Sequence, residues 1–464
     1  MVQSGNMTET PGPPDQSPVR LHGFADHEVI DIRSDSVTAA SREFGSRMKG
    51  ITRQVLDEVR SGAGPWDNLE KTAGSALDHF RSLVSSGVFT AGGVDYGKRY
   101  LDRLEGFASG AEISPAEAIV LDMELDAGCQ TIIVREKGNG RISLIHTEEN
   151  EGDTALVDIN RKRDAGLPFD EAGYRYRIVH QSDGDKTITF LAYPGLSGGG
   201  PAMGINRDTG CMVVVDALFT QADTDPAGSV WVNAVAGMFL DAGDIGTARQ
   251  LAAKMRDRGI TFTGGYAVHL ARAGNPPQLA TFEFGGTHAV EVAPRSLPDR
   301  DVIGQPSHPR SKELAGLDAF TVSAESPPKD FETALYGTEL ARRKRRLELT
   351  GALVDLPDET PEARLDRLTR IAANPYSDAE RITDETTGQT SSDMTGMPSL
   401  WSSAWGVAVI GREPYVVFGK YQAPKLPRKP YGMTVESSDP RKVRAELTEL
   451  ANRRMETEVK PEKP

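Results

Sequence analysis

Cysteine is nearly absent from this chain of 464 residues, which contains only Cys129 and Cys211. Two cysteines in so long a chain do not make the disulfide framework of a small secreted domain. Cys211 begins the apolar run Cys211–Val215, which is typical of a buried strand, so we expect it to be structural. Cys129 follows Gly128 where predicted helices give way to predicted strands, and it is the thiol to consider for chemistry.

The sequence also lacks segments that would place it in a membrane or on nucleic acid. No apolar run is long enough to span a bilayer, and the N-terminus has no apolar signal-peptide core. The formal net charge of -14 disfavours contact with a phosphate backbone or an anionic membrane surface. The 8 histidines lack metal-ligand spacing. We therefore expect a cytoplasmic protein with no metal, no cofactor and no nucleic-acid or membrane partner. The oligomeric state stays open.

Composition and patterning divide the chain into three parts. Residues 1–34 are rich in Pro, Gly, Ser, Asp and Thr and predict a disordered tail. Residues 35–128 predict a helical segment, and residues 129–464 predict a β-rich segment with some later helices. Length alone would allow about three domains, or one large domain with elaborations.

The helical segment is predicted from apolar residues at helical spacing. Three sets predict three helices: Phe44, Met48, Ile51, Val55 and Val59; Leu77, Phe80 and Val84; Tyr96, Tyr100, Leu104 and Phe107. Ser114-Pro115-Ala116-Glu117 is a capping box with proline at the first helical position, so it predicts a fourth helix. Helices, then strands, then helices, then strands are typical of a layered α+β architecture in which sheet packs on sheet.

A hairpin is expected directly after Cys129. The apolar β-branched run Ile132–Val134 predicts a buried strand. Gly138-Asn139-Gly140 then predicts a tight turn, because Gly and Asn tolerate the positive φ that such turns need. Residues 141–149 would form the returning strand.

The register of this hairpin decides which carboxylate lies beside the thiol. If the hairpin is symmetric about Asn139, Cys129 pairs with Glu149. A slip of one residue would instead place Glu148 or Asn150 opposite the thiol. A thiol beside a carboxylate at a strand start is a chemical arrangement, but local evidence alone favours the interpretation of Cys129 as a buried core cysteine near an acidic strand end.

Several segments, taken in order between Glu105 and Glu283, point to a known family. They are Glu105–Ser114 with Glu117, Ile119, Leu121 and Glu124; Gly128-Cys129; Ile145–Glu149; and Tyr193–Leu196 with Gly204–Asn206 and Gly210. Together they resemble the acyl-coenzyme A:6-aminopenicillanic acid acyltransferase family of N-terminal-nucleophile hydrolases (peptidase family C45). Ile145–Glu149 is similar to its "GHNED" segment, and the last set to its "Y-G-hydrophobic … G-M-N-x-x-G" segment.

The resemblance implies a fold and an activity. It implies a four-layer αββα N-terminal-nucleophile hydrolase fold with a helical N-terminal segment. It also implies self-cleavage between Gly128 and Cys129, which would yield a helical α chain and a β-rich β chain. The freed α-amine, with a pKa near about 8, would serve as base for a thiol with a pKa near about 8.5. The enzyme would form an acyl-enzyme from a small amide, peptide or acyl thioester and pass the acyl group to water or an amine.

The resemblance also assigns supporting residues near the nucleophile. Thr131 matches a family Thr two residues after the nucleophile. Glu149 stands where the family has Asp, and Thr147 where it has Asn. The role implied for Glu149 is to orient and charge-balance the amine of Cys129. Cys129, Glu149 and Thr131 are therefore the candidate catalytic residues.

The family's oxyanion donor is missing here. Its "S-x-x-N-Y/F" segment corresponds to Thr261–Tyr266, which has no Asn. A backbone N–H of Gly265 or Tyr266 is the candidate replacement, because backbone amides serve in oxyanion holes. Asn206 is a further candidate contact for substrate.

Two later motifs of the family are only partly matched in this chain. The family's "H-T-N-H" segment appears as Ser307–Arg310, and its late arginine motif as residues 338–347, with Arg343 and Arg346 as counterparts. A solvated helix face is an equally good interpretation of those arginines. These departures keep a second hypothesis open, in which an uncleaved, degenerate family member serves as a binding or structural protein.

The sequence disfavours a serine nucleophile at Ser197. Residues 195–199, centred on Ser197, match the G-x-S-x-G elbow of α/β-hydrolases. A helix must follow that elbow, whereas Pro201 and then a turn and a strand follow here. The same context argues against a dinucleotide-binding loop.

Overall fold

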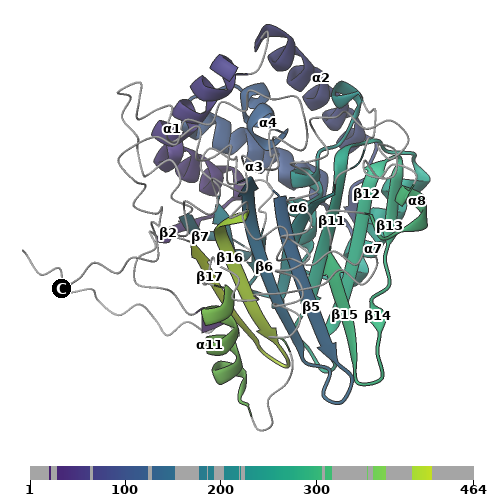
Figure 1. The fold of residues 1–464 in the computed structure, drawn as a ribbon. Coiled ribbons are helices and arrows are strands. Elements are labelled where there is room, and N and C mark those ends of the chain that lie inside the picture. Colours follow the sequence, from purple (N-terminus) through teal and green to yellow (C-terminus); the bar gives the residue numbers. More distant parts are fainter. Residues whose placement is uncertain are drawn as a thin grey trace, which may run out of the picture.

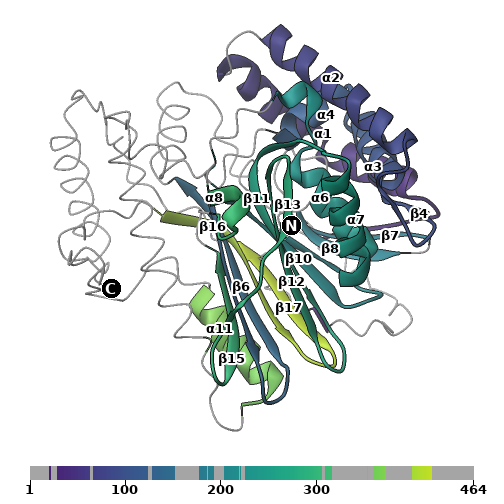
Figure 2. The same cartoon turned by 90° about the vertical axis from the view of Figure 1, so that its right-hand side faces the viewer.

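The protein is a mixed α+β structure in which two large sheets lie face to face (Figures 1 and 2). The computed structural model describes residues 20–21, 29–62, 66–123, 128–151, 177–184, 186–192, 203–218, 220, 225–305, 309–315, 353, 359–372 and 400–420.

The described part of the N-terminal half is mainly helical. Its helices are α1 (Val37–Gly62), α2 (Trp66–Ser85), α3 (Tyr96–Ala111) and α4 (Pro115–Met123), with the short strands β3 (Thr90–Ala91) and β4 (Val94–Asp95) between α2 and α3. The capping box of α4 is confirmed. The Ser114 backbone N–H donates to Glu117 Oε2 over 2.6 Å, and the Glu117 N–H donates to Ser114 Oγ over 3.1 Å.

The prediction of a disordered tail over residues 1–34 is wrong for residues 20–21 and 29–34. Residues 1–19 and 22–28 lie outside the described residues, but Arg20–Leu21 form β1 and Val29–Ser34 form β2. β2 pairs in parallel with β7 (Arg177–Asp183). Ile30 and Ile32 are buried in this strand, and their alternation with polar residues is the period-two pattern of a half-buried strand.

The first sheet has the order β1-β17-β16-β6-β5-β15-β14 among the described residues. Its remaining strands are β5 (Gly128–Glu136), β6 (Ile142–Glu151), β14 (Arg295–Ser296), β15 (Arg300–Gln305), β16 (Leu400–Ile410) and β17 (Pro414–Lys420). The hairpin predicted after Cys129 is therefore present, and it lies at the centre of this sheet.

The second sheet has the order β13-β12-β11-β10-β9-β8-β7-β2. Its remaining strands are β8 (Thr187–Ala192), β9 (Met203–Asn206), β10 (Cys211–Leu218), β11 (Phe262–Arg272), β12 (Gln278–Gly286) and β13 (His288–Glu291). The 3-10 turn η2 (Pro226–Gly228), α6 (Val232–Ala242) and α7 (Ile245–Asp257) connect β10 to β11, and α8 (Lys312–Ala315) follows β15.

Each sheet has one face against the other sheet and one face against helices. Between the sheets, apolar side chains such as Ile133, Leu144 and Val214 form one core cluster. On the outer face of the second sheet, α1, α3, α6 and α7 pack in a larger cluster. On the outer face of the first sheet, α11 (Pro361–Ala372) packs over β5, β6, β16 and β17.

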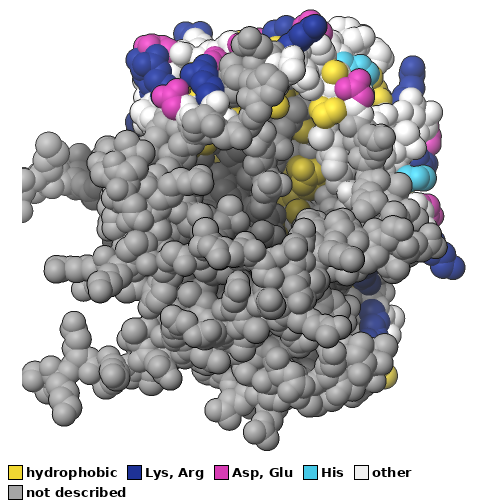
Figure 3. Space-filling view, turned by 45° about the horizontal axis from the view of Figure 1, so that its top comes forward, with side chains coloured by type: hydrophobic (Ala, Val, Ile, Leu, Met, Phe, Trp, Pro, Cys, Tyr) yellow, Lys and Arg dark blue, Asp and Glu magenta, His cyan; other side chains and the backbone are white. Residues whose placement is uncertain are grey.

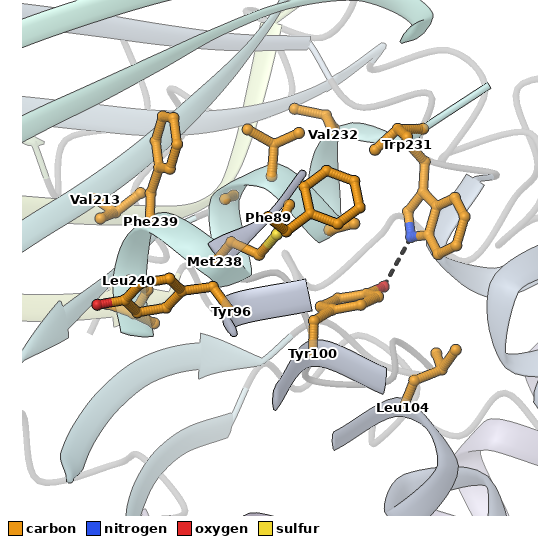
Figure 4. Close-up of a cluster of buried hydrophobic side chains, with 14 of the residues drawn as sticks. Phe89, Tyr96, Tyr100, Leu104, Val213, Trp231, Val232, Met238, Phe239 and Leu240 are labelled. Atoms are coloured by element: carbon orange, nitrogen blue, oxygen red, sulfur yellow. Dashed lines mark hydrogen bonds between the residues drawn. The ribbon is translucent and has the colours of Figure 1, made fainter. Parts of the chain in front are cut away.

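The helical layer contains a cluster of buried aromatic rings (Figure 4). The Trp231 Nε1–H donates to the Tyr100 hydroxyl over 2.7 Å, and that hydroxyl donates to Asp122 Oδ2 over 2.7 Å. Burial, together with the neighbouring Asp122 carboxylate, raises the pKa of Tyr100 well above its usual value, so the hydroxyl stays protonated. These bonds join α3, α4 and the start of α6.

The hairpin turns of both sheets meet at one end of the molecule. The Ala273 N–H donates to Gly210 O over 3.1 Å, and the Gly274 N–H donates to Gly411 O over 3.0 Å. Gly140, in the β5–β6 turn, lies against the prolines of the β11–β12 turn. We call this the turn end. The opposite end, where β5 and β11 begin, is called the open end.

The first prediction concerns the contact between α1 and α3. A Cβ at Gly110 would overlap the carbonyl of Arg42, whereas a Cβ at Gly50, also helical, would meet nothing within 4 Å. Gly110→Ala should therefore lower the free energy of unfolding by about 3 kcal/mol through overpacking. Gly50→Ala should raise it by about 0.5–1 kcal/mol, because alanine restricts the unfolded chain. Chemical denaturation measures both, and equal effects would contradict the close helix approach.

Candidate active site

Cys129 is the second residue of β5 and lies at the open end of the first sheet. Its side chain is 5% exposed. Strand alternation puts Cys129 on the same face as Thr131 and Ile133, and Ile133 belongs to the core between the sheets. The thiol therefore belongs to the inter-sheet face rather than to the face that packs on α11.

The expected register of the hairpin is wrong by one residue. Cys129 pairs with Glu148, and Gly128 pairs with Glu149. This is the one-residue slip that the sequence left open.

The reason for the slip lies in the turn. The Glu136 N–H donates to Arg141 O over 2.9 Å, so four residues form the loop and its centre falls between Gly138 and Asn139. Gly140 has a φ of 73°, and the Arg141 N–H donates to Asn139 Oδ1 over 2.7 Å. This turn geometry displaces the centre from Asn139 and moves every pairing by one position.

Five buried polar side chains connect the two sheets next to Cys129. Thr131 Oγ1 lies 2.7 Å from His146 Nδ1, within the first sheet. His146 Nδ1 lies 3.8 Å from Asp216 Oδ1, across the inter-sheet space. In the second sheet, His269 Nε2 lies 2.8 Å from Asp216 Oδ2, and His269 Nδ1 lies 2.8 Å from Thr281 Oγ1. All five side chains are fully buried. We call them the inter-sheet polar cluster.

Sequence reasoning missed most of this cluster. The sequence points to Thr131, but it does not single out His146, Asp216, His269 or Thr281. One signal was present, because Asp216 interrupts the apolar strand Cys211–Leu218. A carboxylate in a buried strand requires a partner, since an unpaired buried charge is costly.

A further buried carboxylate, Glu283, shares this face of the second sheet. Its register partner in β11 is Ala267, one step along that face from His269. Glu283 Oε1 accepts the Arg310 N–H over 2.8 Å, and Oε2 accepts the Ser311 N–H over 2.8 Å. These bonds tie the start of residues 309–315 to β12 at the open end.

Gly265 and Tyr266 lie at the same end of the molecule as Cys129. They pair with Leu218 and Ala217, at the end of β10 that is remote from its turn. The β11–β12 register shifts between Phe262 and Gly265, and Gly264 has a φ of 69°. A side chain at position 265 would overlap Thr220. This irregular, tightly packed backbone is the type of segment that can present an N–H to a ligand.

Asn206 lies at the turn end instead, away from Cys129. Its Nδ2 donates to Leu240 O over 3.0 Å. Its Oδ1 accepts the N–H groups of Asp208 and Thr209, each over 3.2 Å. These contacts make Asn206 a support of the β9–β10 turn, and the structure does not bring it to the other candidate residues.

Arg343, Arg346 and Ser197 lie outside the described residues.

Cys211 is fully buried and belongs to the core that faces the helices. Burial raises the pKa of its thiol to about 12. This agrees with the structural role expected for Cys211 from its apolar run.

The open end is hollowed in the space-filling view (Figure 3). In this view, hydrophobic side chains stand beside the hollow on its described side, and charged side chains lie further out, at the upper rim and the right-hand edge of the picture. Within the described ranges, no three His, Cys, Asp or Glu side chains are grouped so that they could hold a metal ion. None of the described helices is long and apolar enough to cross a bilayer.

Comparison with known proteins adds no identification. No protein-family model matches this chain, and no curated protein matches it. The family membership suggested by the motifs therefore stays a prediction.

A second prediction follows from the hairpin register. Because position 148 pairs with Cys129, Glu148→Gln should shift the pH dependence of Cys129 alkylation to lower pH, since a facing carboxylate disfavours the thiolate. Glu149→Gln is the matched control and should have a smaller effect. Iodoacetamide labelling followed by peptide mass spectrometry gives both profiles. A larger shift in the Glu149 variant would show that the family correspondence, and not the strand register, identifies the acidic neighbour.

A third prediction separates the two thiols. Iodoacetamide at neutral pH should label Cys129 and spare Cys211 until denaturant is added, because a thiol with a pKa of about 12 is almost wholly protonated. Cys211→Ala should leave the labelled amount unchanged, whereas Cys129→Ala should abolish it. Labelling of Cys211 ahead of Cys129 in the folded protein would contradict this assignment.

Proposed function

We propose that the protein is a cysteine N-terminal-nucleophile amide hydrolase or acyltransferase whose nucleophile is Cys129. The position of that thiol carries the proposal. Cys129 stands at the start of a central strand, at the open end of the inter-sheet face, beside a buried hydroxyl–imidazole pair. Cys211 also begins an interior strand, β10, but it lies at the turn end and faces the helices.

The chemistry needs only groups that this chain supplies. Cleavage of the Gly128–Cys129 bond frees an α-amine on the nucleophile itself. That amine accepts the thiol proton while Sγ attacks the carbonyl carbon of an amide. The tetrahedral intermediate then collapses, the leaving amine takes the proton, and a thioester remains. Water or a second amine attacks this thioester, the acyl group is transferred, and the thiol is restored.

The tetrahedral intermediate requires donors for its oxygen. The proposal assigns this role to the backbone near Gly265 and Tyr266, since the segment contains no Asn. Their place at the start of β11, at the same end as Cys129, supports the assignment. Loss of one oxyanion-hole donor costs about 2.7–4 kcal/mol of transition-state stabilisation.

The finer fold assignment belongs to the same proposal. Helices on the outer face of each of two facing sheets support the four-layer αββα arrangement of N-terminal-nucleophile hydrolases. The proposed substrate is a small-molecule amide or acyl donor, and the proposed location is the cytoplasm. The net charge of -14 supports a small substrate more than a nucleic acid.

A second function, as an uncleaved binding or structural protein, has one observation in its favour. Cys129 is 5% exposed, which is little for a nucleophile that must meet a substrate. Processing decides between the two hypotheses, because a released N-terminal amine is needed for catalysis and is useless to a binding protein.

The fourth prediction concerns this processing. Purified protein should separate into fragments 1–128 and 129–464 under denaturing mass spectrometry, and the fragments should stay associated under native conditions. Cys129→Ala should remain one chain, because it has no nucleophile. Thr131→Val, with Thr131→Ser as the matched control, should slow cleavage if the hydroxyl supports the site. A wild-type chain that stays intact on long incubation would leave the binding hypothesis as the better one.

A further inference from the structure

The ionisable groups of the inter-sheet polar cluster are not all satisfied by hydrogen bonds. His269 is satisfied on both ring nitrogens, by Asp216 and by Thr281. Asp216 Oδ1, in contrast, has no hydrogen-bond partner within the described part of the chain. His146 Nδ1 lies 3.8 Å from this oxygen. A fully buried carboxylate oxygen without a hydrogen-bond partner thus lies close to a second imidazole.

The hydrogen bond between Thr131 and His146 can run in either direction, depending on whether Nδ1 carries a proton. Where Nδ1 carries none, the Thr131 hydroxyl donates to that nitrogen. Where Nδ1 is protonated, Nδ1–H becomes the donor, and the Thr131 oxygen accepts. The hydroxyl proton of Thr131 is then released from His146 and can be donated to another atom on the inter-sheet face. One proton on His146 therefore reverses the direction in which Thr131 donates.

Asp216 is the charged group that acts on His146 across the inter-sheet space. A carboxylate within about 4–6 Å of an imidazole favours the imidazolium form, whereas burial of the imidazole opposes it. Water does not screen the attraction between these two fully buried groups. His269 bonds the same carboxylate, so the two histidines share Asp216.

We propose that His146 and Asp216 are positioning residues of the Cys129 site, in which the proton on His146 determines whether the Thr131 hydroxyl is available to a group bound at Cys129. Thr131 is two residues from Cys129 on the same face, about 6.6 Å along the strand. An imidazole titrates closest to neutral pH of all side chains, so the arrangement makes the site pH-sensitive. The inference rests on the proposed role of Cys129 as nucleophile.

Among the residues whose side chains the structure describes, the other titratable groups on this face are Cys129 on β5, His269 on β11 and Glu283 on β12. Position 148 on β6 pairs with Cys129. Glu283 already accepts two backbone N–H groups. The register partners of His146 and Thr131 on the flanking strands are Gly406 and Gln305, which do not titrate.

The first test reads His146 directly and needs no enzyme activity. Histidine labelled with ¹³C at Cε1 gives one NMR signal per imidazole, and loss of a signal in His146→Gln identifies His146. Asp216→Asn should lower the pKa of His146 by about one to three units. Asp241→Asn is the matched control, because Asp241 is an equally buried carboxylate that pairs with Arg103 in the helical layer. It should leave the pKa of His146 unchanged.

The second test follows the Thr131 hydroxyl through its effect on the reactivity of the Cys129 thiol. The rate of Cys129 alkylation by iodoacetamide, followed against pH, should show a step at the pH where His146 titrates. Thr131→Val should remove this step while His146 still titrates, and Thr131→Ser should keep it. These conservative variants serve where Asp216→Asn does not fold.

The outcomes separate the two proposals. An unchanged pKa of His146 in Asp216→Asn overturns the role of Asp216. A step that survives in Thr131→Val overturns the role of the hydroxyl. Complete absence of Cys129 labelling in every variant counts against the nucleophile and the Thr131 link, while the NMR result still judges the Asp216–His146 pair.

Discussion

One buried carboxylate constrains how the two sheets meet. Asp216 lies on an otherwise apolar strand of the second sheet, and burying its charge alone would cost several kcal/mol. His269 bonds it from the neighbouring strand, and His146 approaches it from the opposite sheet. The first sheet must therefore face the second with β6 over β10 at this point. Apolar contacts alone would tolerate sliding, since hydrophobic attraction has no direction.

The space between the sheets is divided along its length. Toward the turn end it is filled by aliphatic side chains such as Ile142, Met212 and Ile410. Toward the open end, polar side chains replace them, and the strands carry glycines at Gly265 and Gly406 where neighbouring side chains leave no room. The apolar half supplies burial energy, which offsets the cost of keeping polar groups dry in the other half. Pre-organised polar groups in a dry site are what the proposed acyl transfer would require.

Local features could be predicted from the sequence, and long-range ones could not. The capping box at Ser114 and the structural role of Cys211 depend on neighbouring residues, and both are present. The hairpin was predicted in the right place, but its register depended on side-chain bonds of Asn139 that spacing does not encode. β2 was missed because its partner, β7, lies far away in the chain. His146 lies on β6, in the first sheet, whereas Asp216 and His269 lie on the neighbouring strands β10 and β11 of the second, so only the assembled sheets reveal their contact.

The two cysteines have the same side chain but different surroundings. The face of the sheet and the end of the strand on which each thiol lies determine which groups surround it. Both are buried, and both belong to strands within the two sheets. Cys211 faces the helices, where desolvation by apolar neighbours holds its thiol protonated. Cys129 faces the opposite sheet beside Thr131 and His146, where hydroxyl and imidazole groups can bear or donate protons. A single step along either strand would exchange these surroundings, because side chains alternate between faces. The one-residue register of the β5–β6 hairpin is for this reason a chemical property of the site as well as a structural one.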